Sequence, residues 1–427
     1  MSDGSENPGP FAGLRVLELG QYVAVPYCAE LFAHGGAEVI KVEPIDGDET
    51  RKNSAIVPGE GRQYIIKSRG KKGIPIDLGS AAGRQLARRL ALSCDVVLSN
   101  MRPGAVEEAG IGYDQLKEDH PGLIFGEVNA FGSKGPDAAR AGLDVIVQAA
   151  SGLTLSGRAW EDGVPVGSEA FLTDYMAGMT LAFGVTTALR ERDRTGRGQK
   201  VSTSLLQASL ALQTATANVI DAVDGWKREF VARREQEGTT YASFVERRDQ
   251  TASNRWFYNT YQTRDGFVAL GAPGKLRGKL MAILSIDDPS VSDPNFRMPD
   301  DPRPMLAELK AAAAASVASF TTKDLLDRCS AAGVPAAPLR FLEEVVLGEQ
   351  ARANGFVETF DHPAVGPMTM PTMALTFSES AYRASSSSPA YGEHTRDVLE
   401  GLGMSPADVD ELASARVVGV PESPPRW

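Results

Sequence analysis

The sequence predicts an α/β protein with a parallel sheet and a second, smaller unit inserted in the chain. Short apolar strands alternate with helices through roughly the first 200 residues, and parallel strands require such crossover helices. The length of 427 residues exceeds the usual size of one hydrophobic core. After about residue 222 the pattern changes to a charged helix and then to a hairpin, which marks a domain boundary.

The first strand–helix–strand unit ends at Glu43. LRVLEL (14–19) is a short apolar strand, and residues 26–34 form a helix that stops at a glycine pair. AEVIKVE (37–43) then returns as a second strand. Two consecutive strands joined by a helix pair in parallel, so this unit begins the sheet.

Further strands follow a helix over residues 81–92. CDVVLSN (94–100) ends one strand at Asn100, and GLIFGEVNAF (122–131) forms another. Ligands of parallel sheets bind beyond the carboxyl ends of the strands. The segments that follow the first three strands are therefore expected to share one binding edge: residues 22–25, 43–47 and 100–104.

The later part of the chain predicts a small domain and a return to the large one. Residues 222–249 form a charged helix, and NRWFYNTYQTRDGFVALGAPG (254–274) has the pattern of a hairpin. The chain then returns to the large domain through AGVPAAPLRFLEEVV and a final helix (393–402). The predicted segments are a flexible tail (1–10), a large domain in two parts (11–221 and 331–427) and a small domain (222–330).

Composition excludes several classes of function. A formal net charge of -11 argues against binding to nucleic acid or to an anionic membrane, since both need a broad basic surface. Three cysteines without a C-x-x-C pair indicate a reducing compartment, and four scattered histidines complete no metal site. The first ten residues lack the apolar core of a signal peptide or anchor. We therefore expect a cytoplasmic enzyme without a metal.

Asp174 is the first candidate for chemistry. It precedes a long, mostly apolar helix in EAFLTDYMAGMTLAFGVTTALRER, so it lies near a helix N-terminus. Free backbone N–H groups and the helix dipole favour a carboxylate there, as a carboxylate nucleophile requires. A helix cap has the same pattern, and local sequence leaves both interpretations open.

Several segments together resemble the family III CoA-transferases. They occur in the family's order over nearly the whole chain: GLRVLELGQYVAVPYCAELFAHGGAEVIKVE, NMRPGAVEEAGIGYDQL, LTDYMAG, TGRGQKV, AGVPAAP and YGEHTRDVL. The resemblance implies a Rossmann-like large CoA-binding domain built from both ends of the chain, a smaller α+β domain and an interlocked homodimer. It also implies acyl-CoA and carboxylic acid substrates, no permanently bound cofactor, and Asp174 as the nucleophile.

The resemblance also carries over candidate CoA-binding residues. Two of them follow the first strand, and their alternative role is helix packing. Three others belong to a basic loop with Lys67, whose alternative is a solvated run of charges. The last two stand in an N-x-R-P-G pattern typical of the family. These candidates are Val23, Ala24, Arg69, Lys71, Lys72, Asn100 and Arg102. The basic residue that the family often has after the second strand is Pro44 here, which puts that phosphate contact in doubt.

A sister activity, α-methylacyl-CoA racemisation, uses the matching Asp with a His in a G-H-D triplet. Here the triplet reads Gly142-Leu143-Asp144, and leucine transfers no proton. Asp144 is the second catalytic candidate because it can orient groups at the thioester; a polar helix start is the alternative.

In the implied mechanism Asp174 carries first the acyl group and then CoA, and backbone N–H groups, with Gly271–Gly274 as a candidate, stabilise the oxyanions. A racemase and a non-catalytic acyl-CoA-binding protein are the alternative functions. A dinucleotide site at Glu43 is disfavoured, because no G-x-G-x-x-G follows the first strand. The sequence does not identify the acids.

Overall fold

The computed structural model describes residues 9–157, 159–245 and 255–427. It divides into two compact units: the large unit comprises Met1–Lys227 and Asn354–Trp427, and the small unit comprises Arg228–Ala353. Most of the predicted flexible tail, residues 1–8, lies outside the described residues. The large unit is discontinuous in sequence, since residues after the small unit return to it.

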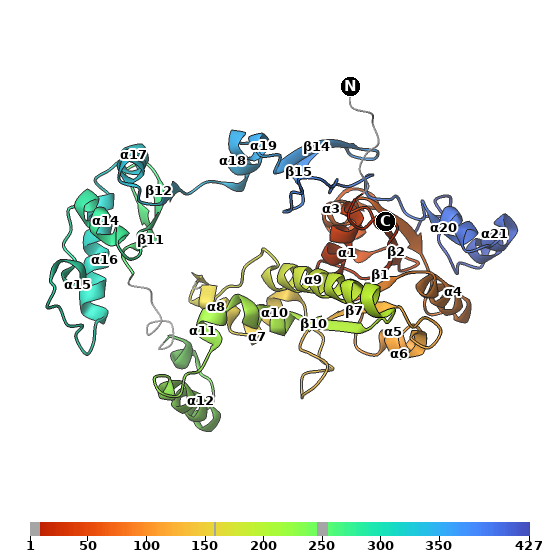
Figure 1. Cartoon of the computed structure of the whole chain (residues 1–427), viewed down its shortest axis with the longest axis horizontal. Helices are drawn as coiled ribbons and strands as arrows, with labels where there is room; N and C mark the ends of the chain where they lie inside the picture. The colour runs from red at the N-terminus through yellow and green to blue at the C-terminus, as the bar shows by residue number, and fades with distance from the viewer. Residues whose placement is uncertain (1–8, 158, 246–254) are drawn as a thin grey trace. The chain divides into compact units, whose positions relative to one another are not determined.

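A six-stranded parallel sheet forms the centre of the large unit (Figure 1). In spatial order its strands are β10 (Lys200–Ser204), β7 (Ile124–Asn129), β6 (Val96–Ser99), β1 (Arg15–Leu19), β2 (Glu38–Glu43) and β5 (Lys71–Pro75). This confirms the predicted α/β class and parallel sheet. From β1 the chain first adds strands on one side and later on the other, so the strand order reverses between β1 and β6. Such a reversal opens a crevice at the carboxyl ends of the strands.

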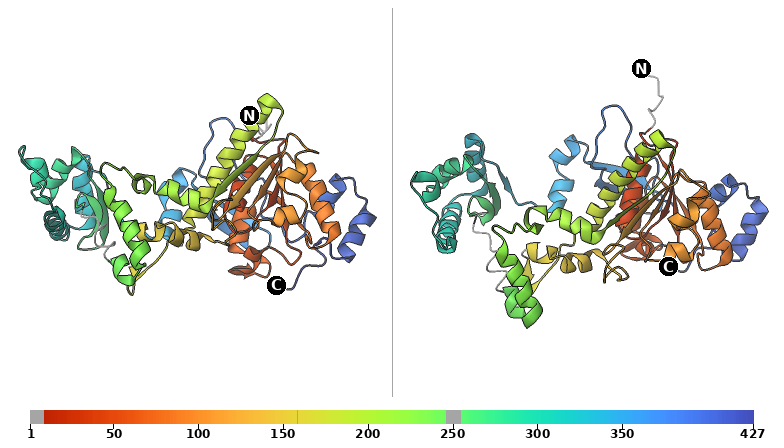
Figure 2. Two further views of the ribbon diagram at one scale, coloured as in Figure 1. Left: turned by 90° about the horizontal axis from the view of Figure 1, so that it is seen from below. Right: turned by 60° about the horizontal axis from the view of Figure 1, so that its bottom comes forward.

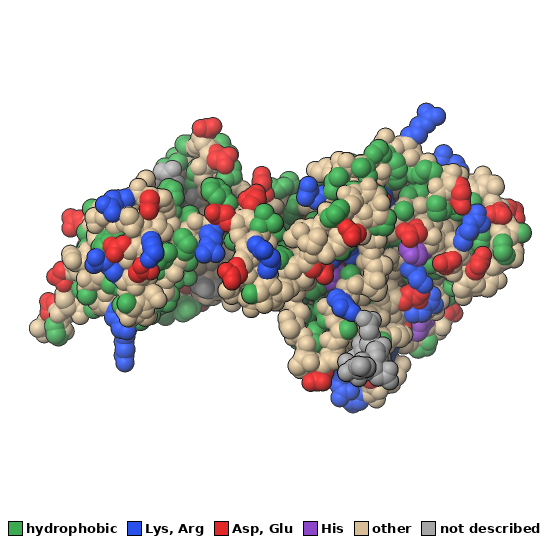
Figure 3. Space-filling model, turned by 90° about the horizontal axis from the view of Figure 1, so that it is seen from above, with side chains coloured by type: hydrophobic (Ala, Val, Ile, Leu, Met, Phe, Trp, Pro, Cys, Tyr) green, Lys and Arg blue, Asp and Glu red, His purple; other side chains and the backbone are tan. Residues whose placement is uncertain are grey.

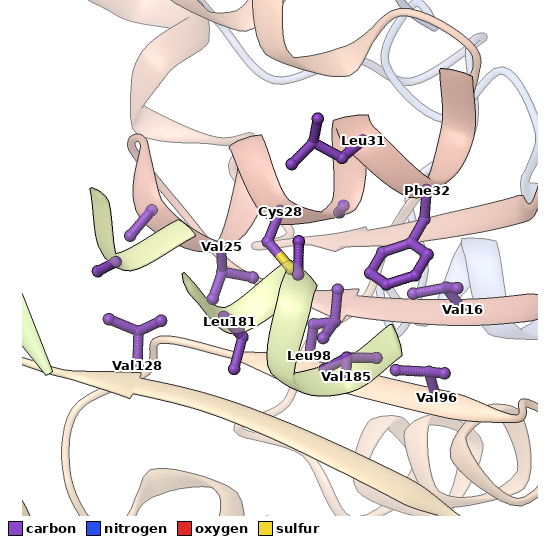
Figure 4. Packing of buried hydrophobic residues seen from close by; sticks show 14 of the residues in the cluster. Val16, Val25, Cys28, Leu31, Phe32, Val96, Leu98, Val128, Leu181 and Val185 are labelled. Carbon is purple, nitrogen blue, oxygen red and sulfur yellow. The ribbon is translucent and has the colours of Figure 1, made fainter. Parts of the chain in front are cut away.

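Side chains alternate between the two faces of this sheet, and helices cover both. On one face, valines such as Val16 and Val96 pack against α1 (Ala24–His34) and α9 (Leu172–Thr195), as Figure 4 shows for Val25 and Cys28 of α1 and Leu181 and Val185 of α9. Strands buried on both faces explain the near-continuous apolar runs in the sequence.

The second face is covered by elements from both ends of the chain. Leu17, Ile40 and Val97 pack with α4 (Ala81–Leu92) and with α20 (Thr395–Gly401) and α21 (Pro406–Ser414). Figures 1 and 2 show these two C-terminal helices beside α4. Ser80 starts α4 by accepting a hydrogen bond from the Gly83 N–H, as a helix N-cap does.

The remaining elements of the large unit are short helices and small hairpins, together with α12, of which only the first three residues belong to the large unit. They are α2 (Glu49–Lys52), β3 (Ala55–Val57), β4 (Glu60–Gly61), α3 (Arg62–Ser68), α5 (Ala105–Glu108), α6 (Tyr113–Leu116), α7 (Asp144–Ala150), α8 (Leu153–Gly157), β8 (Trp160–Glu161), β9 (Val164–Pro165), α10 (Leu205–Leu212), α11 (Thr214–Ala217), α12 (Gly225–Glu237), β14 (Val357–His362) and β15 (Gly366–Pro371).

The small unit has its own core around Trp256, whose indole N–H donates to Asp288 Oδ2 at 2.9 Å. Its sheet has the order β11 (Tyr258–Gln262), β12 (Phe267–Gly271), β13 (Ala336–Pro338), and the antiparallel β11–β12 pair is the predicted hairpin. Its helices are α14 (Leu276–Leu284), α15 (Pro289–Ser292), α16 (Arg303–Val317), α17 (Thr322–Ala332), α18 (Leu342–Val346) and α19 (Glu349–Ala353).

The predicted end of the small domain, residue 330, differs from the boundary in the structure, which follows Ala353. The reason is β13, which pairs with β12 and keeps the chain in the small unit. The predicted charged helix over residues 222–249 is partly present as α12, and its last residues lie outside the described part.

Basic and acidic side chains intermingle on the face shown in Figure 3. This mixture fits the acidic net charge, and no broad basic patch covers that face. Within the described residues, no helix combines the length and apolar character needed to cross a membrane.

Candidate active site

Asp174 lies in the first turn of α9, two residues after the helix begins. It is not the residue that caps this helix: the N-cap is Phe171, whose side chain makes no cap hydrogen bond. The capping groups come instead from Asp144, on α7. Its Oδ1 accepts hydrogen bonds from the Thr173 N–H (2.7 Å), the Thr173 hydroxyl (2.5 Å) and the Asp174 N–H (3.2 Å). This argues against the interpretation of Asp174 as a simple cap.

Asp144 is buried, with 4% of its surface exposed, and its second oxygen accepts from Gln148 Nε2. The Gln148 amide in turn bonds to both the carbonyl and the N–H of Ser168. Asp144 thus starts its own helix but directs its carboxylate to the start of α9. The arrangement fixes the position of Asp174 rather than placing Asp144 on a reacting group, which favours an orienting role.

A close approach between α1 and α9 brings a further donor to Asp174. At Gly178, one turn after Asp174, a Cβ atom would lie 2.5 Å from the carbonyl oxygen of Ala24. Only glycine permits this distance, since real Cβ contacts are longer. The contact places the start of α1 against the start of α9, and the Ala24 N–H bonds to the Asp174 carboxylate.

The surroundings of Asp174 favour its protonated form. Burial is the main cause, the neighbouring Asp144 carboxylate adds to it, and the Ala24 N–H opposes them, so that the pKa of Asp174 rises from 3.8 to about 7. A carboxylate with a raised pKa is a stronger base and a better nucleophile than an ordinary one. It is also partly ionised at neutral pH, as a nucleophile must be.

Two pockets meet near Asp174, at the point where the strand order reverses. The Asp174 pocket, about 210 Å³, is lined by Tyr22, Ala24, Asn100, Met101, Arg102, Pro103, Val128, Asn129, Ala130, Arg140, Ala141, Gly142, Leu143, Asp174 and Leu205. The β1 pocket, about 460 Å³, is more apolar and is lined by Leu19, Gly20, Gln21, Tyr22, Val42, Glu43, Pro44, Ile45, Ile76, Asp77, Leu78, Gly79, Asn100, Met101 and Arg102. Four residues line both: Tyr22, Asn100, Met101 and Arg102. The expected binding edge of the sheet is therefore hollowed.

The structure brings three of the predicted binding residues to the Asp174 pocket, namely Ala24, Asn100 and Arg102. The Asn100 amide bonds to both the N–H and the carbonyl of Gln21, at 3.0 and 2.9 Å, so it joins the ends of β6 and β1. Arg102 is exposed and pairs with Glu108. Val23 is buried as the N-cap residue of α1 and lines neither pocket, which fits the helix-packing alternative.

The basic loop is arranged differently from the prediction. Lys71 is buried and bonds to Glu18 Oε2 and the Pro26 carbonyl, and Arg69 is buried against Glu358. Lys72 pairs with Glu38, and neither pocket includes these three residues. Their charges are already matched within the fold, which argues against the predicted phosphate contacts.

Sequence reasoning missed three contributors to the site. Gln148 and Thr173 complete the hydrogen bonds around Asp144, and no local pattern distinguishes them from ordinary polar helix residues. Arg140 lines the Asp174 pocket, but in the sequence it stands in a stretch without a strand or helix signal. Glu43, the residue of the dinucleotide alternative, has both oxygens bound by Arg51 and Tyr64, so it is occupied within the fold.

The sequence profile of CoA-transferase family III matches residues 11–395. The chain belongs to this family. It is thus an enzyme, a family III CoA-transferase, and CoA thioesters fit it as substrates.

Relatives with named activities match nearly the full chain. Succinyl-CoA–L-malate CoA-transferase beta subunit of Chloroflexus aurantiacus is 30% identical, with 97% of this chain and 100% of the relative covered. Succinyl-CoA:glutarate CoA-transferase of Mus musculus is 29% identical, covering 96% and 90%. Cinnamoyl-CoA:phenyllactate CoA-transferase of Clostridium sporogenes is 29% identical, covering 95% and 96%.

Solved structures share the fold. Rv3272 of M. tuberculosis has a TM-score of 0.74 at 26% identity, with 92% of this chain and 100% of that chain covered. A CaiB/BaiF family protein of Brucella suis has a TM-score of 0.69 at 26% identity, covering 93% and 100%. The mixed α/β architecture with its large parallel sheet is thus that of the family.

Proposed function

We propose that this family III CoA-transferase moves CoA from an acyl-CoA donor to a carboxylic acid through covalent intermediates on Asp174. The observation that carries the proposal is the setting of this carboxylate: it lies in a pocket at a helix N-terminus, partly buried, beside Asp144 and the Ala24 N–H. Burial removes water that would otherwise solvate the nucleophile.

The proposed reaction uses the carboxylate twice. Asp174 attacks the donor thioester carbonyl, the C–S bond breaks, and an aspartyl-acyl anhydride and CoA thiolate form. The thiolate then attacks the Asp174 carbonyl carbon, which releases the donor acid and leaves an aspartyl-CoA thioester. The acceptor carboxylate repeats these steps in reverse, so that the new acyl-CoA leaves and Asp174 is regenerated. The chemistry needs no permanently bound cofactor, because Asp174 carries each group in turn.

The roles of the other residues follow from their contacts. Asp144 acts as a positioning residue that holds the first turn of α9. The joined pockets suit a long thioester, with its reacting end at Asp174 and the rest along the edge of the sheet. Arg102 and Arg140 are the cations among the pocket-lining residues, and we assign them to the anionic groups of the substrates. The predicted oxyanion donors of Gly271–Gly274 are largely unavailable, because the Gly271 and Ala272 N–H groups donate to the carbonyls of Pro335 and Phe257 and proline at 273 has no N–H.

The racemase alternative lacks its second base. Leu143, at the position of the racemase histidine, lines the Asp174 pocket, and no histidine is among its lining residues. With a 2-methylacyl-CoA in deuterated water, we expect CoA transfer to an added acid without deuterium at the α-carbon. Rapid α-deuteration would instead assign the protein to the racemases.

The decisive experiment is a panel of acyl-CoA donors and acids followed by mass spectrometry of the intact protein. The named relatives suggest succinyl-CoA and cinnamoyl-CoA as donors and malate, glutarate and phenyllactate as acceptors. Exchange of CoA into an acid, together with a CoA or acyl adduct on the peptide that contains Asp174, is the expected result. An adduct elsewhere, or exchange that survives in Asp174→Ala, would refute the assignment.

We also propose that the enzyme is a homodimer in the cytoplasm, where its three buried, unpaired cysteines stay reduced. Large apolar side chains such as Phe183 (75% exposed), Phe341 (77%) and Leu342 (73%) support burial against a second copy. Light scattering at micromolar concentration should give a dimer. A stable folded monomer would contradict the interlocked architecture.

A further inference from the structure

Tyr22 lies where the Asp174 pocket meets the β1 pocket. It follows β1, precedes α1 and lines both cavities together with Asn100, Met101 and Arg102. With 41% of its surface exposed, Tyr22 is not a core side chain. Tyr22 is thus an aromatic residue at the junction of the two pockets.

The backbone of Tyr22 is held in an unfavourable conformation. Its φ of 63° lies in the left-handed region, where a bulky residue is strained and glycine is not. Such strain persists only where the surrounding structure enforces it, and it concentrates at functional sites.

Contacts on both preceding residues enforce this conformation. Buried Lys41 donates to the Gly20 carbonyl at 2.7 Å, and the Asn100 amide bonds to both backbone groups of Gln21. Gly20 also has no room for a side chain, since a Cβ there would lie 2.5 Å from a methyl group of Val25. These contacts therefore hold the backbone at Tyr22 in a conformation that a glycine would adopt without strain.

We propose that the Tyr22 ring is a barrier that keeps water from the covalent intermediates on Asp174 and so makes the acid, rather than water, the acceptor. The inference rests on the proposed function. In the side reaction that the ring suppresses, a water oxygen attacks the carbonyl carbon of the aspartyl-CoA thioester and the C–S bond breaks. One water proton goes to the CoA sulfur and the other to solvent, so Asp174 is regenerated and free CoA thiol is produced.

Substitutions that remove the ring without adding strain test this barrier. Tyr22→Gly and Tyr22→Asn both tolerate the left-handed backbone, and Tyr22→Phe keeps the ring. Ser54→Gly is the matched control: Ser54 also has a positive φ (52°), is exposed and lines neither pocket. For each variant, with the donor and acid that give the fastest wild-type exchange, free CoA thiol reports hydrolysis and new acyl-CoA reports transfer.

The expected result is a ratio of hydrolysis to transfer that rises about tenfold or more in Tyr22→Gly and Tyr22→Asn, because water exclusion prevents such side reactions. Tyr22→Phe and Ser54→Gly keep the wild-type ratio, and the melting temperature of Tyr22→Gly is equal to that of the wild type or higher. An unchanged ratio in the two ring-free variants, or an equal rise in Ser54→Gly, would overturn the barrier alone. Absence of any exchange in the wild type would refute the proposed function and the barrier with it.

Discussion

Two carboxylates at the same end of the large unit, buried Glu43 and partly buried Asp174, have opposite surroundings. The carboxylate of Glu43, at the end of β2, accepts hydrogen bonds from Arg51 Nε at 2.7 Å, from Arg51 Nη2 at 2.9 Å and from the Tyr64 hydroxyl at 2.9 Å. Asp174 has no such partner: in the described part of the chain no lysine or arginine forms an ion pair with it, and its charged neighbour is Asp144. The charge of Glu43 is therefore matched by a cation, whereas that of Asp174, the proposed nucleophile, is not.

The electrostatic consequences differ accordingly. Burial opposes the charge of Arg51, but Tyr64 and Glu43 outweigh it and raise the pKa of the guanidinium. At Asp174 burial and Asp144 act together, and the pKa rises to about 7. The first arrangement keeps the Arg51 guanidinium charged at every physiological pH, whereas the second makes the charge of Asp174 depend on pH.

The largest expected effect is on catalysis. Asp174→Ala should lower CoA transfer by a factor on the order of 1,000 or more, because the covalent route is lost. The fold should stay intact, since Asp144 rather than Asp174 caps α9. Steady-state transfer and circular dichroism check the two parts. A variant that keeps more than a few per cent of wild-type activity would remove Asp174 from the nucleophile's role.

A substitution in the pair of Glu43 and Arg51 should instead change the stability of the fold. Arg51→Ala leaves buried Glu43 without its cation and should lower the free energy of unfolding by about 3–5 kcal/mol. Urea denaturation measures this loss. Arg396→Ala removes an exposed pair with Asp410 and serves as the control, with no measurable change expected. An equally stable Arg51 variant would mean that the cluster contributes little.

The stability of the protein should depend on pH through Asp174. The pKa of Asp174 is higher in the folded protein than in the unfolded chain, so its contribution to stability is fully present below pH 4 and is lost as pH rises through about 7. Asp174→Asn avoids this loss, and it should raise stability at pH 8 by up to about 4 kcal/mol but not at pH 4. Melting temperatures of both proteins across this range test the sign. A gain that shrinks as pH rises would contradict it.

The smallest expected effect concerns two cations that are each paired with a glutamate, exposed Arg102 and half-buried Lys72. Arg102 lines both pockets, whereas Lys72 lines neither. Arg102→Ala should raise KM for the acyl-CoA about fivefold with little change in kcat, since exposed charges bind weakly, and Lys72→Ala should leave both constants unchanged. A larger effect at Lys72 would restore the predicted basic loop as the phosphate site.

Much of the large unit could be predicted because its signals are local. Apolar runs of strand length, separated by amphipathic helices, predict the parallel sheet, and the ends of β1 and β6 indicate the edge where the pockets lie. Asp174 could be placed at a helix start from the sequence around it. These features depend on residues close to one another in the chain.

The features that could not be predicted depend on contacts between distant segments. Nothing near Lys71 shows that Glu18 will neutralise it inside the fold. The cap that Asp144 provides for α9 joins residues on different helices. The end of the small unit was missed because β13 is only three residues long, contains a proline and has no strand signal of its own.

The position of α20 and α21 has a consequence for how the protein is made. These helices cover one face of the sheet, and residues 417–419 bond along the outer edge of β5, yet they are synthesised hundreds of residues after the strands that they protect. At the usual pace of translation the apolar face and the open edge are exposed for a time on the order of tens of seconds. The residues that line the two pockets are therefore synthesised while the opposite face of their sheet still lacks its cover, and chaperones that bind exposed apolar surface would have time to act.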